Sequence, residues 1–70
     1  MRTTNVERIK EVYKTGTRIR LRYMEGERDM YDGLEGTVTR VDDIGQIHMR
    51  WDNGRSLAIN PDVDSWEVIA

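Results

Sequence analysis

Three arginines alternate with apolar residues in the first third of the chain, at Arg18, Arg20 and Arg22. In a strand, this alternation places the three side chains on one face, about 6.6–6.8 Å apart. Such a row of guanidinium groups could contact successive phosphates of a nucleic acid. Carboxylates of neighbouring strands could equally pair with the row, as on an ordinary solvated sheet face. Because the net charge is -2 and nucleic-acid-binding domains are usually basic, we favour the paired surface and keep nucleic-acid binding as the alternative.

Acidic residues offer a second kind of chemistry, in metal binding or in acid–base catalysis. Asp62, Asp64 and Glu67 supply some of the carboxylates of a calcium loop. The segment lacks the glycine at the sixth position and the glutamate at the twelfth, so we predict turn chemistry there and no metal site. Two other carboxylate pairs fall in predicted surface turns, where no burial would separate their pKa values for acid–base work. These pairs are Asp42 with Asp43, and Asp29 with Asp32.

The one histidine, His48, follows Ile47 and precedes Met49. We predict that these two apolar neighbours face the core, so His48 should point outward, with no carboxylate or nucleophile held beside it. The serines, Ser56 and Ser65, lie in no strained-turn motif, and the chain has no cysteine and no phosphate-binding GxxxxGK(S/T) loop. We therefore predict no catalytic residue, no cofactor and no metal, in a protein that is not an enzyme.

Three aromatic residues, Tyr23, Tyr31 and Trp66, could gather near one end of the predicted sheet. Together they would form a groove for a peptide or a platform on which bases stack. We favour the interpretation in which at least two of the three close the core. The acidic and aromatic loop signature of SH3 domains that bind proline-rich peptides is absent, which disfavours that ligand class.

The first segment of the chain predicts a short helix. Thr4 and Glu7 have the spacing of a capping box, in which each side chain accepts a backbone N–H of the other. Val6, Ile9 and Tyr13 follow the helical period and share one face. A helix of about three turns does not persist alone in water, so this face must dock on the rest of the chain or on a second copy.

From residue 17 onward the period changes from helical to two, which predicts strands. We expect strands over residues 17–23, 34–41 and 47–51, a fourth around Leu57 and Ile59, and a fifth around Trp66 and Val68. A polar loop, residues 24–33, separates the first two. The predicted core consists of Ile19, Leu21, Leu34, Val38, Val41, Ile47, Met49, Trp51, Leu57, Ile59, Trp66 and Val68.

Two places in this pattern predict irregular backbone. Gly36 inside a strand indicates a bulge or the close approach of another chain segment. Val38 and Val41 are three residues apart, so a bulge near residues 39–40 is needed for both to face the core. Residues 53–54, Asn-Gly between two alternating runs, predict a type I′ hairpin turn.

The overall composition fits one small globular domain. The chain has 70 residues, of which 37% are hydrophobic and 34% charged. Five short antiparallel strands with tight turns predict a mainly β fold, a small SH3-like barrel over residues 16–70 preceded by a helix within residues 1–15. No apolar run is long enough for a membrane span, and the first residues lack an apolar signal segment, so we expect a cytoplasmic protein. We expect a monomer or a weak homodimer.

Several runs resemble a small bacterial domain family of unknown function that is found in phage, plasmid and conjugative-element gene sets. The similar runs are residues 16–21, 33–38, 41–45, 51–54 and 57–59, with the Asp-Asp-Ile-Gly and Trp-Asp-Asn-Gly segments as the most specific. The resemblance covers about residues 16–69. It implies an SH3-like barrel and transfers no catalytic or binding residue. A weaker resemblance to ribosomal and transcription-factor barrels supports the nucleic-acid alternative.

The sequence thus favours a non-enzymatic protein-interaction module from a phage or other mobile element. The alternative is an accessory protein that binds nucleic acid through Arg18, Arg20 and Arg22. A third hypothesis is an assembly element in which Val6, Ile9 and Tyr13 dock on a second copy.

Overall fold

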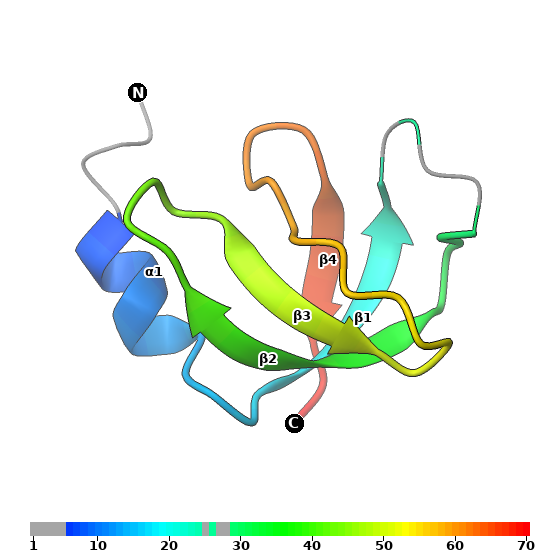
Figure 1. Ribbon diagram of the computed structural model, residues 1–70, viewed down its shortest axis with the longest axis horizontal. Coiled ribbons are helices and arrows are strands. Elements are labelled where there is room, and N and C mark those ends of the chain that lie inside the picture. The colour runs from blue at the N-terminus through cyan, green and yellow to red at the C-terminus, as the bar shows by residue number, and fades with distance from the viewer. Residues whose placement is uncertain (1–5, 25, 27–28) are drawn as a thin grey trace.

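A computed structural model describes residues 6–24, 26 and 29–70 of the chain. Its elements within those residues are α1 (Val6–Val12), β1 (Arg18–Tyr23), β2 (Glu35–Val41), β3 (Ile47–Trp51) and β4 (Ser65–Val68). The strands pair antiparallel in one sheet with the order β3-β2-β1-β4 (Figure 1). The chain therefore has the predicted mainly β fold with one short helix. Of the predicted capping box, Thr4 lies outside the described residues.

The predicted fourth strand, around Leu57 and Ile59, is not a strand. Backbone hydrogen bonds join this segment to β3 at Ile47 with Ile59 and at Trp51 with Arg55. Between these two points the Leu57 carbonyl accepts the indole N–H of Trp51 at 2.8 Å, which diverts it from a regular ladder. The described sheet therefore has four strands and is not closed, and the predicted five-stranded barrel is not confirmed.

The turn at Asn53 and Gly54 forms, but the prediction of type I′ was wrong. That turn needs a positive φ at both residues, whereas all positive φ values among the described residues belong to glycines, including 91° at Gly54. The Gly54 N–H donates to the Trp51 carbonyl at 3.0 Å. Asn53 Oδ1 accepts the Arg55 N–H at 3.1 Å. Asn53 thus serves as a hydrogen-bond acceptor in the turn and keeps a negative φ.

Both irregular strand positions predicted from the sequence are confirmed. The register between β2 and β3 shifts between Val38 and Arg40, where the bulge was expected. Gly36 lies against the neighbouring strand so closely that an added Cβ would be 2.7 Å from Trp51 Cε3 and 2.9 Å from the Arg50 carbonyl oxygen. The close packing of β2 against β3 therefore requires a glycine at position 36.

The core lies on the inner face of the curled sheet. Its buried apolar residues are Ile19, Leu21, Met24, Met30, Leu34, Val38, Ile47, Met49, Trp51 and Ile59. The prediction was wrong for Val68, which is 49% exposed because β4 is an edge strand of the open sheet. It also missed Met24 and Met30 in the predicted polar loop. Their flexible apolar side chains fold back onto the core although their neighbours in the sequence are polar.

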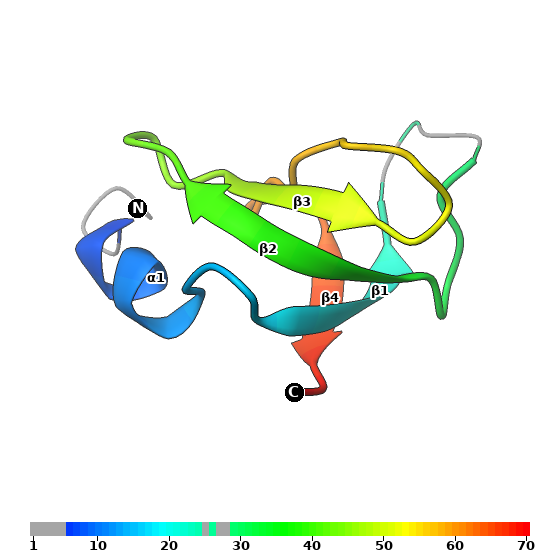
Figure 2. The same cartoon turned by 60° about the horizontal axis from the view of Figure 1, so that its bottom comes forward.

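The helix α1 docks on the sheet of its own chain, at one end of the curled strands (Figure 2). Ile9 and Tyr13 pack against the core, and the Tyr13 ring meets Trp66 edge-on at a centroid distance of 6.0 Å. A Cβ added to Gly45, in the turn after β2, would lie 3.4 Å from Val6 Cγ2. The predicted docking face of the helix is thus used within the chain. This helix is not long and apolar enough to cross a membrane.

Candidate functional site

The arginines of β1 share the outer face of the sheet, and each is paired with carboxylates. Arg18 Nη2 lies 2.8 Å from Asp52 Oδ2 and 3.3 Å from Glu35 Oε1. Arg20 bridges Glu35 and Glu67, with Nη2 and Nη1 at 3.3 and 3.0 Å from their oxygens. Arg20 can reach both because Glu35 is its partner residue on β2 and Glu67 is its partner on β4.

The same alternation continues to the end of β1. Arg22 lies 3.6 Å from Glu67 Oε2 through Nη1 and 3.2 Å from Asp32 Oδ1 through Nε. The result is a continuous chain of alternating charges, here called the arginine ladder. Its members are, in order, Asp52, Arg18, Glu35, Arg20, Glu67, Arg22 and Asp32. The ladder has more carboxylates than guanidinium groups, so it offers no excess positive charge.

Hydrogen bonding stabilises the charged forms within the ladder. The hydrogen bond to Asp52 is the main cause of the raised pKa of Arg18, and the one to Glu67 is the main cause of the raised pKa of Arg20. The hydrogen bond from Arg18 lowers the pKa of Asp52. These groups are therefore ionised at neutral pH. A phosphate that approached this face would have to displace a carboxylate from each arginine.

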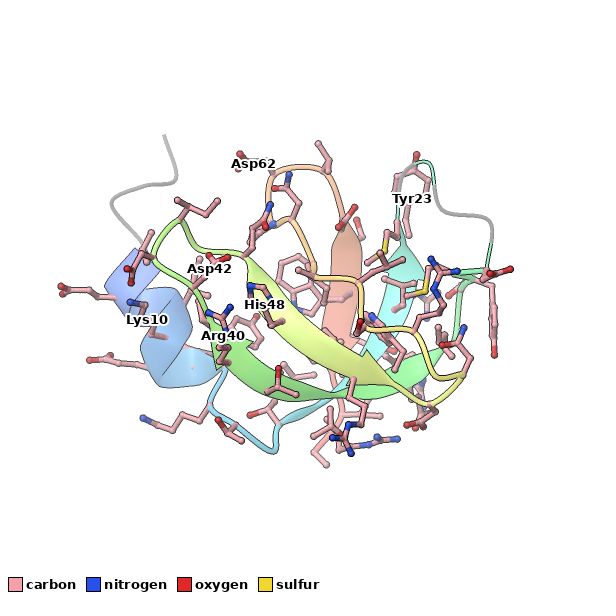
Figure 3. All side chains as sticks on the ribbon, in the orientation of Figure 1. Lys10, Tyr23, Arg40, Asp42, His48 and Asp62 are labelled. Carbon is pink, nitrogen blue, oxygen red and sulfur yellow. The ribbon has the colours of Figure 1, made fainter. Side chains whose placement is uncertain are left out.

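A different basic surface lies where the end of α1 meets β2. Its residues line an open hollow of about 310 Å³, here called the basic pocket: Lys10, Tyr13, Lys14, Thr15, Arg40 and Val41. Figure 3 shows Lys10 and Arg40 at the same end of the molecule, one on the helix and the other on the strand. Three of the lining residues are cations: Lys10 on α1, Lys14 in the segment after it and Arg40 on β2. This arrangement can attract an anionic group.

The cations of the basic pocket are only partly neutralised. Lys10 Nζ lies 2.8 Å from Asp43 Oδ1. Lys14 and Arg40 make no ion pair with any residue that the structure describes. Thr15 anchors the chain after the helix, since its hydroxyl donates to the Thr39 carbonyl at 2.9 Å. The basic pocket thus differs from the arginine ladder in having two cations, Lys14 and Arg40, that no described carboxylate contacts directly, although Arg40 lies near enough to Asp43 to help lower its pKa.

His48 does have a carboxylate beside it, contrary to the prediction. Its Nε2 lies 2.8 Å from Asp42 Oδ2, at the base of the β2–β3 hairpin (Figure 3). The other oxygen of Asp42 accepts the N–H groups of Ile44 and Gln46 at 3.2 and 2.9 Å. These hydrogen bonds, that of His48 first, lower the pKa of Asp42. The sequence spacing missed the contact because it depends on the register after the bulge in β2, which pairs Arg40 with His48 and leaves Asp42, just beyond the strand, within reach of the His48 ring. The pair stabilises the hairpin turn. A His–Asp pair needs a nucleophile to take part in catalysis, and no serine is among the residues that line the neighbouring basic pocket.

The structure brings neither predicted carboxylate pair together for acid–base work. Asp42 turns to His48 and Asp43 turns to Lys10. Asp29 pairs with Arg55 at 2.6 Å, whereas Asp32 belongs to the arginine ladder.

The segment compared with a calcium loop is a hydrogen-bonded turn. Asp64 Oδ2 accepts the Asn60 N–H at 2.8 Å, and Asn60 Oδ1 accepts the Asp62 N–H at 3.0 Å. Glu67 points to the arginines of β1. Within the described parts of the chain, no three histidine or acidic side chains gather as a metal site would require.

The three aromatic residues do not form one cluster. Trp66 packs on the core with Tyr13. Tyr23 and Tyr31 are 54% and 57% exposed, so the expectation that at least two of the three close the core was wrong. Tyr23 ends β1 and Tyr31 lies in the loop that leads to β2, whereas Met24 and Met30 of the same loop are buried in the core.

Sequence reasoning missed the basic pocket altogether. Lys10 and Lys14 are four residues apart, a spacing that places them on one face of the predicted helix and that could have indicated half of the pocket, although α1 ends at Val12 and Lys14 lies beyond it. Arg40 could not be added, because its position depends on the bulge and on where α1 docks.

The fold and its charged surface define a small, open antiparallel β-sheet domain with a docked N-terminal helix. The chain belongs to the family described as Domain of unknown function (DUF4314), which it matches over residues 2–69. This confirms the predicted resemblance to a small domain family of unknown function. No curated protein matches the chain.

Among solved structures, the chain is similar to a crystal structure of a double mutant of Pif1 helicase from Bacteroides. The TM-score is 0.54 at 24% sequence identity, and the match covers 80% of this chain and 16% of the helicase chain. The likeness concerns the fold alone.

Proposed function

We propose that this protein is a non-enzymatic interaction module that binds an acidic segment of a partner protein in the basic pocket. The observation that carries the proposal is the contrast between the two basic surfaces. The arginine ladder is neutralised by its own carboxylates, whereas Lys14 and Arg40 make no ion pair with any described residue, and Asp43 interacts with Arg40 only at a longer distance. A carboxylate placed between Lys14 and Arg40 would gain charge-assisted hydrogen bonds from both sides.

The size and lining of the basic pocket suit a short peptide segment. Its volume of about 310 Å³ is near the lower limit for small-ligand sites. Tyr13 and Val41 supply apolar surface to its lining. A peptide with one or two acidic side chains would fill the hollow, with the CH₂ groups of those side chains against Tyr13 and Val41.

A protein partner is favoured over a nucleic acid by the charges around the pocket. The overall net charge is -2, and the carboxylates of the arginine ladder occupy the outer face of the same sheet. A polyphosphate backbone that extended from the pocket across β1 would meet these carboxylates. A short acidic segment confined to the pocket avoids them.

The order of the strands supports an SH3-like architecture that is open along one edge. The order β4-β1-β2-β3 followed by the segment at 55–59 is the neighbour order expected for five successive strands of such a barrel. The association with phage and other mobile elements remains a prediction.

The test is a fluorescence anisotropy titration. The probe is a labelled peptide of alternating Glu and Gly, and a Gln–Gly peptide of the same length is the control. The double variant Lys14→Gln/Arg40→Gln should bind the Glu peptide about tenfold more weakly, since two exposed charge contacts are lost. A matched control, Arg8→Gln/Arg50→Gln, removes the same charge outside the pocket and should change the affinity less than about twofold.

Two results would overturn the proposal. One is a Glu peptide that shows no binding to the wild-type protein up to about 1 mM, or binds no better than the Gln peptide. The other is an equal loss of affinity in both double variants, which would show general attraction of charge in place of a site.

A further inference from the structure

One cation of the basic pocket already holds a carboxylate of the same chain. Lys10 Nζ donates to Asp43 Oδ1 at 2.8 Å, across the gap between α1 and the turn that follows β2. The Asp43 side chain is 98% exposed. The hydrogen bond from Lys10 is the main cause of its lowered pKa, and the charge of Arg40 contributes further. Asp43 therefore lies at the rim of the pocket as an anion under the influence of two of its cations.

The hairpin turn does not depend on the side chain of Asp43. Its neighbour Asp42 makes the contacts that hold the turn, to the Ile44 and Gln46 N–H groups and to His48. The hydrogen bond that Asp43 makes through its side chain is to Lys10. The two adjacent aspartates thus have separate tasks, and the side chain of Asp43 can leave Lys10 while the turn keeps its shape.

We propose that Asp43 is an internal competitor for the basic pocket, occupying Lys10 in the free protein as a stand-in for a carboxylate of the partner. This inference rests on the proposed function. A ligand with one carboxylate is met by Lys14 and Arg40, with Asp43 still in place. A ligand with several carboxylates can also take Lys10, and it then displaces Asp43.

Asp43 consequently sets how the pocket discriminates between ligands. Because Asp43 is tethered close to Lys10, a weakly binding single carboxylate does not compete with it, whereas an acidic segment anchored at Lys14 and Arg40 does. Removing the charge of Asp43 should strengthen binding of a peptide with several acidic residues. An exposed ion pair of this kind shifts the affinity by about two- to fivefold.

The experiment compares Asp43→Asn with the matched control Asp29→Asn. Asp29 is also an exposed aspartate in an ion pair, with Arg55, but it lies beside the turn after β3, at the end of the sheet opposite α1 (Figures 1 and 2). Both variants change the net charge equally. The Glu–Gly peptide should bind Asp43→Asn about two- to fivefold more tightly than Asp29→Asn at the same ionic strength.

A second measurement tests the route through Lys10. The substitution Lys10→Gln should weaken peptide binding more in the Asp43→Asn background than in the wild-type background, since Lys10 is available to the ligand only after Asp43 is removed. Equal effects in the two backgrounds would overturn the inference, as would equal affinities of Asp43→Asn and Asp29→Asn. The proposed function is judged separately: it stands if the wild-type protein binds the peptide and the double variant Lys14→Gln/Arg40→Gln binds it more weakly. Failure of that double variant to lose affinity overturns both.

Discussion

The close approach of β2 and β3 at Gly36 makes a sharp prediction for the substitution Gly36→Ala. The new Cβ would lie 2.7 Å from Trp51 Cε3, 2.9 Å from the Arg50 carbonyl oxygen and 3.0 Å from Trp51 Cα. Ordinary van der Waals contacts between carbons are about 3.5–4.0 Å, so the two carbon contacts are too short by roughly 0.5–1 Å, and the contact with the carbonyl oxygen is also too close. Two of the three atoms are backbone, and the indole is held in the core by its hydrogen bond to Leu57. The strands must therefore move apart.

We expect this substitution to lower the free energy of unfolding by about 3 kcal/mol, the upper part of the range for overpacking. A core of this size rarely supplies more than about 3–5 kcal/mol, so most of the stability would be lost. With an m-value of about 1 kcal/mol/M, the urea midpoint followed by tryptophan fluorescence should fall by about 3 M.

The control for this prediction is Gly54→Ala. An added Cβ there meets nothing within 4 Å, but the residue has a φ of 91°, so only conformational strain of about 1 kcal/mol is expected. If Gly36→Ala unfolded at the same urea concentration as Gly54→Ala, or near the wild type, the steric argument would be refuted.

Three further predictions concern the core and the hairpin. Because the pKa of Asp42 is lowered in the folded state, its contribution to stability is complete above the ordinary aspartate value of about 3.9 and is lost as the pH falls through the lower, folded value. Urea midpoints at pH 7 and pH 3 should therefore differ less in Asp42→Asn than in the wild type, and an unchanged difference would contradict this. Trp51→Phe removes the donor to the Leu57 carbonyl and should cost about 2 kcal/mol in the same assay, whereas a cost near zero would show that the interrupted ladder does not need the indole. Val68→Thr, at the open edge, should change stability by less than about 0.5 kcal/mol, while Val38→Thr in the buried core should cost about 2 kcal/mol; similar costs would mean that the edge is covered.

Much of the local structure could be predicted from the sequence because it depends on neighbouring residues. The alternation around Ile19 and Leu21 predicted both the strand and the side of the sheet that its arginines occupy. The three-residue spacing of Val38 and Val41 predicted a bulge, since a pleated strand turns every second side chain to the same face. The helical spacing of Ile9 and Tyr13 predicted the face that docks.

Other predictions from the sequence were wrong because groups distant in the sequence compete for the same hydrogen bonds or the same space. The sequence around Leu57 predicts a strand, in which its carbonyl would accept a backbone N–H. In the structure this carbonyl accepts the indole N–H of Trp51. Asn53 has the type of residue that tolerates a left-handed conformation, yet it accepts the N–H of Arg55 with a negative φ. Val68 alternates as a core residue, but β4 has no further strand beside it to bury the side chain.

The charge of each surface was decided only by the tertiary structure. The sequence determined that three arginines share one face, because alternation is a property of the single strand. Their partners, including Glu35 and Glu67, come from other strands, so the neutrality of that face depends on the register of β1 with β2 and β4. Lys14 and Arg40 line the same pocket because α1 docks beside the bulge of β2. Electrostatic pairing depends on distance in space, and in this chain that distance is set by the packing of elements far apart in the sequence.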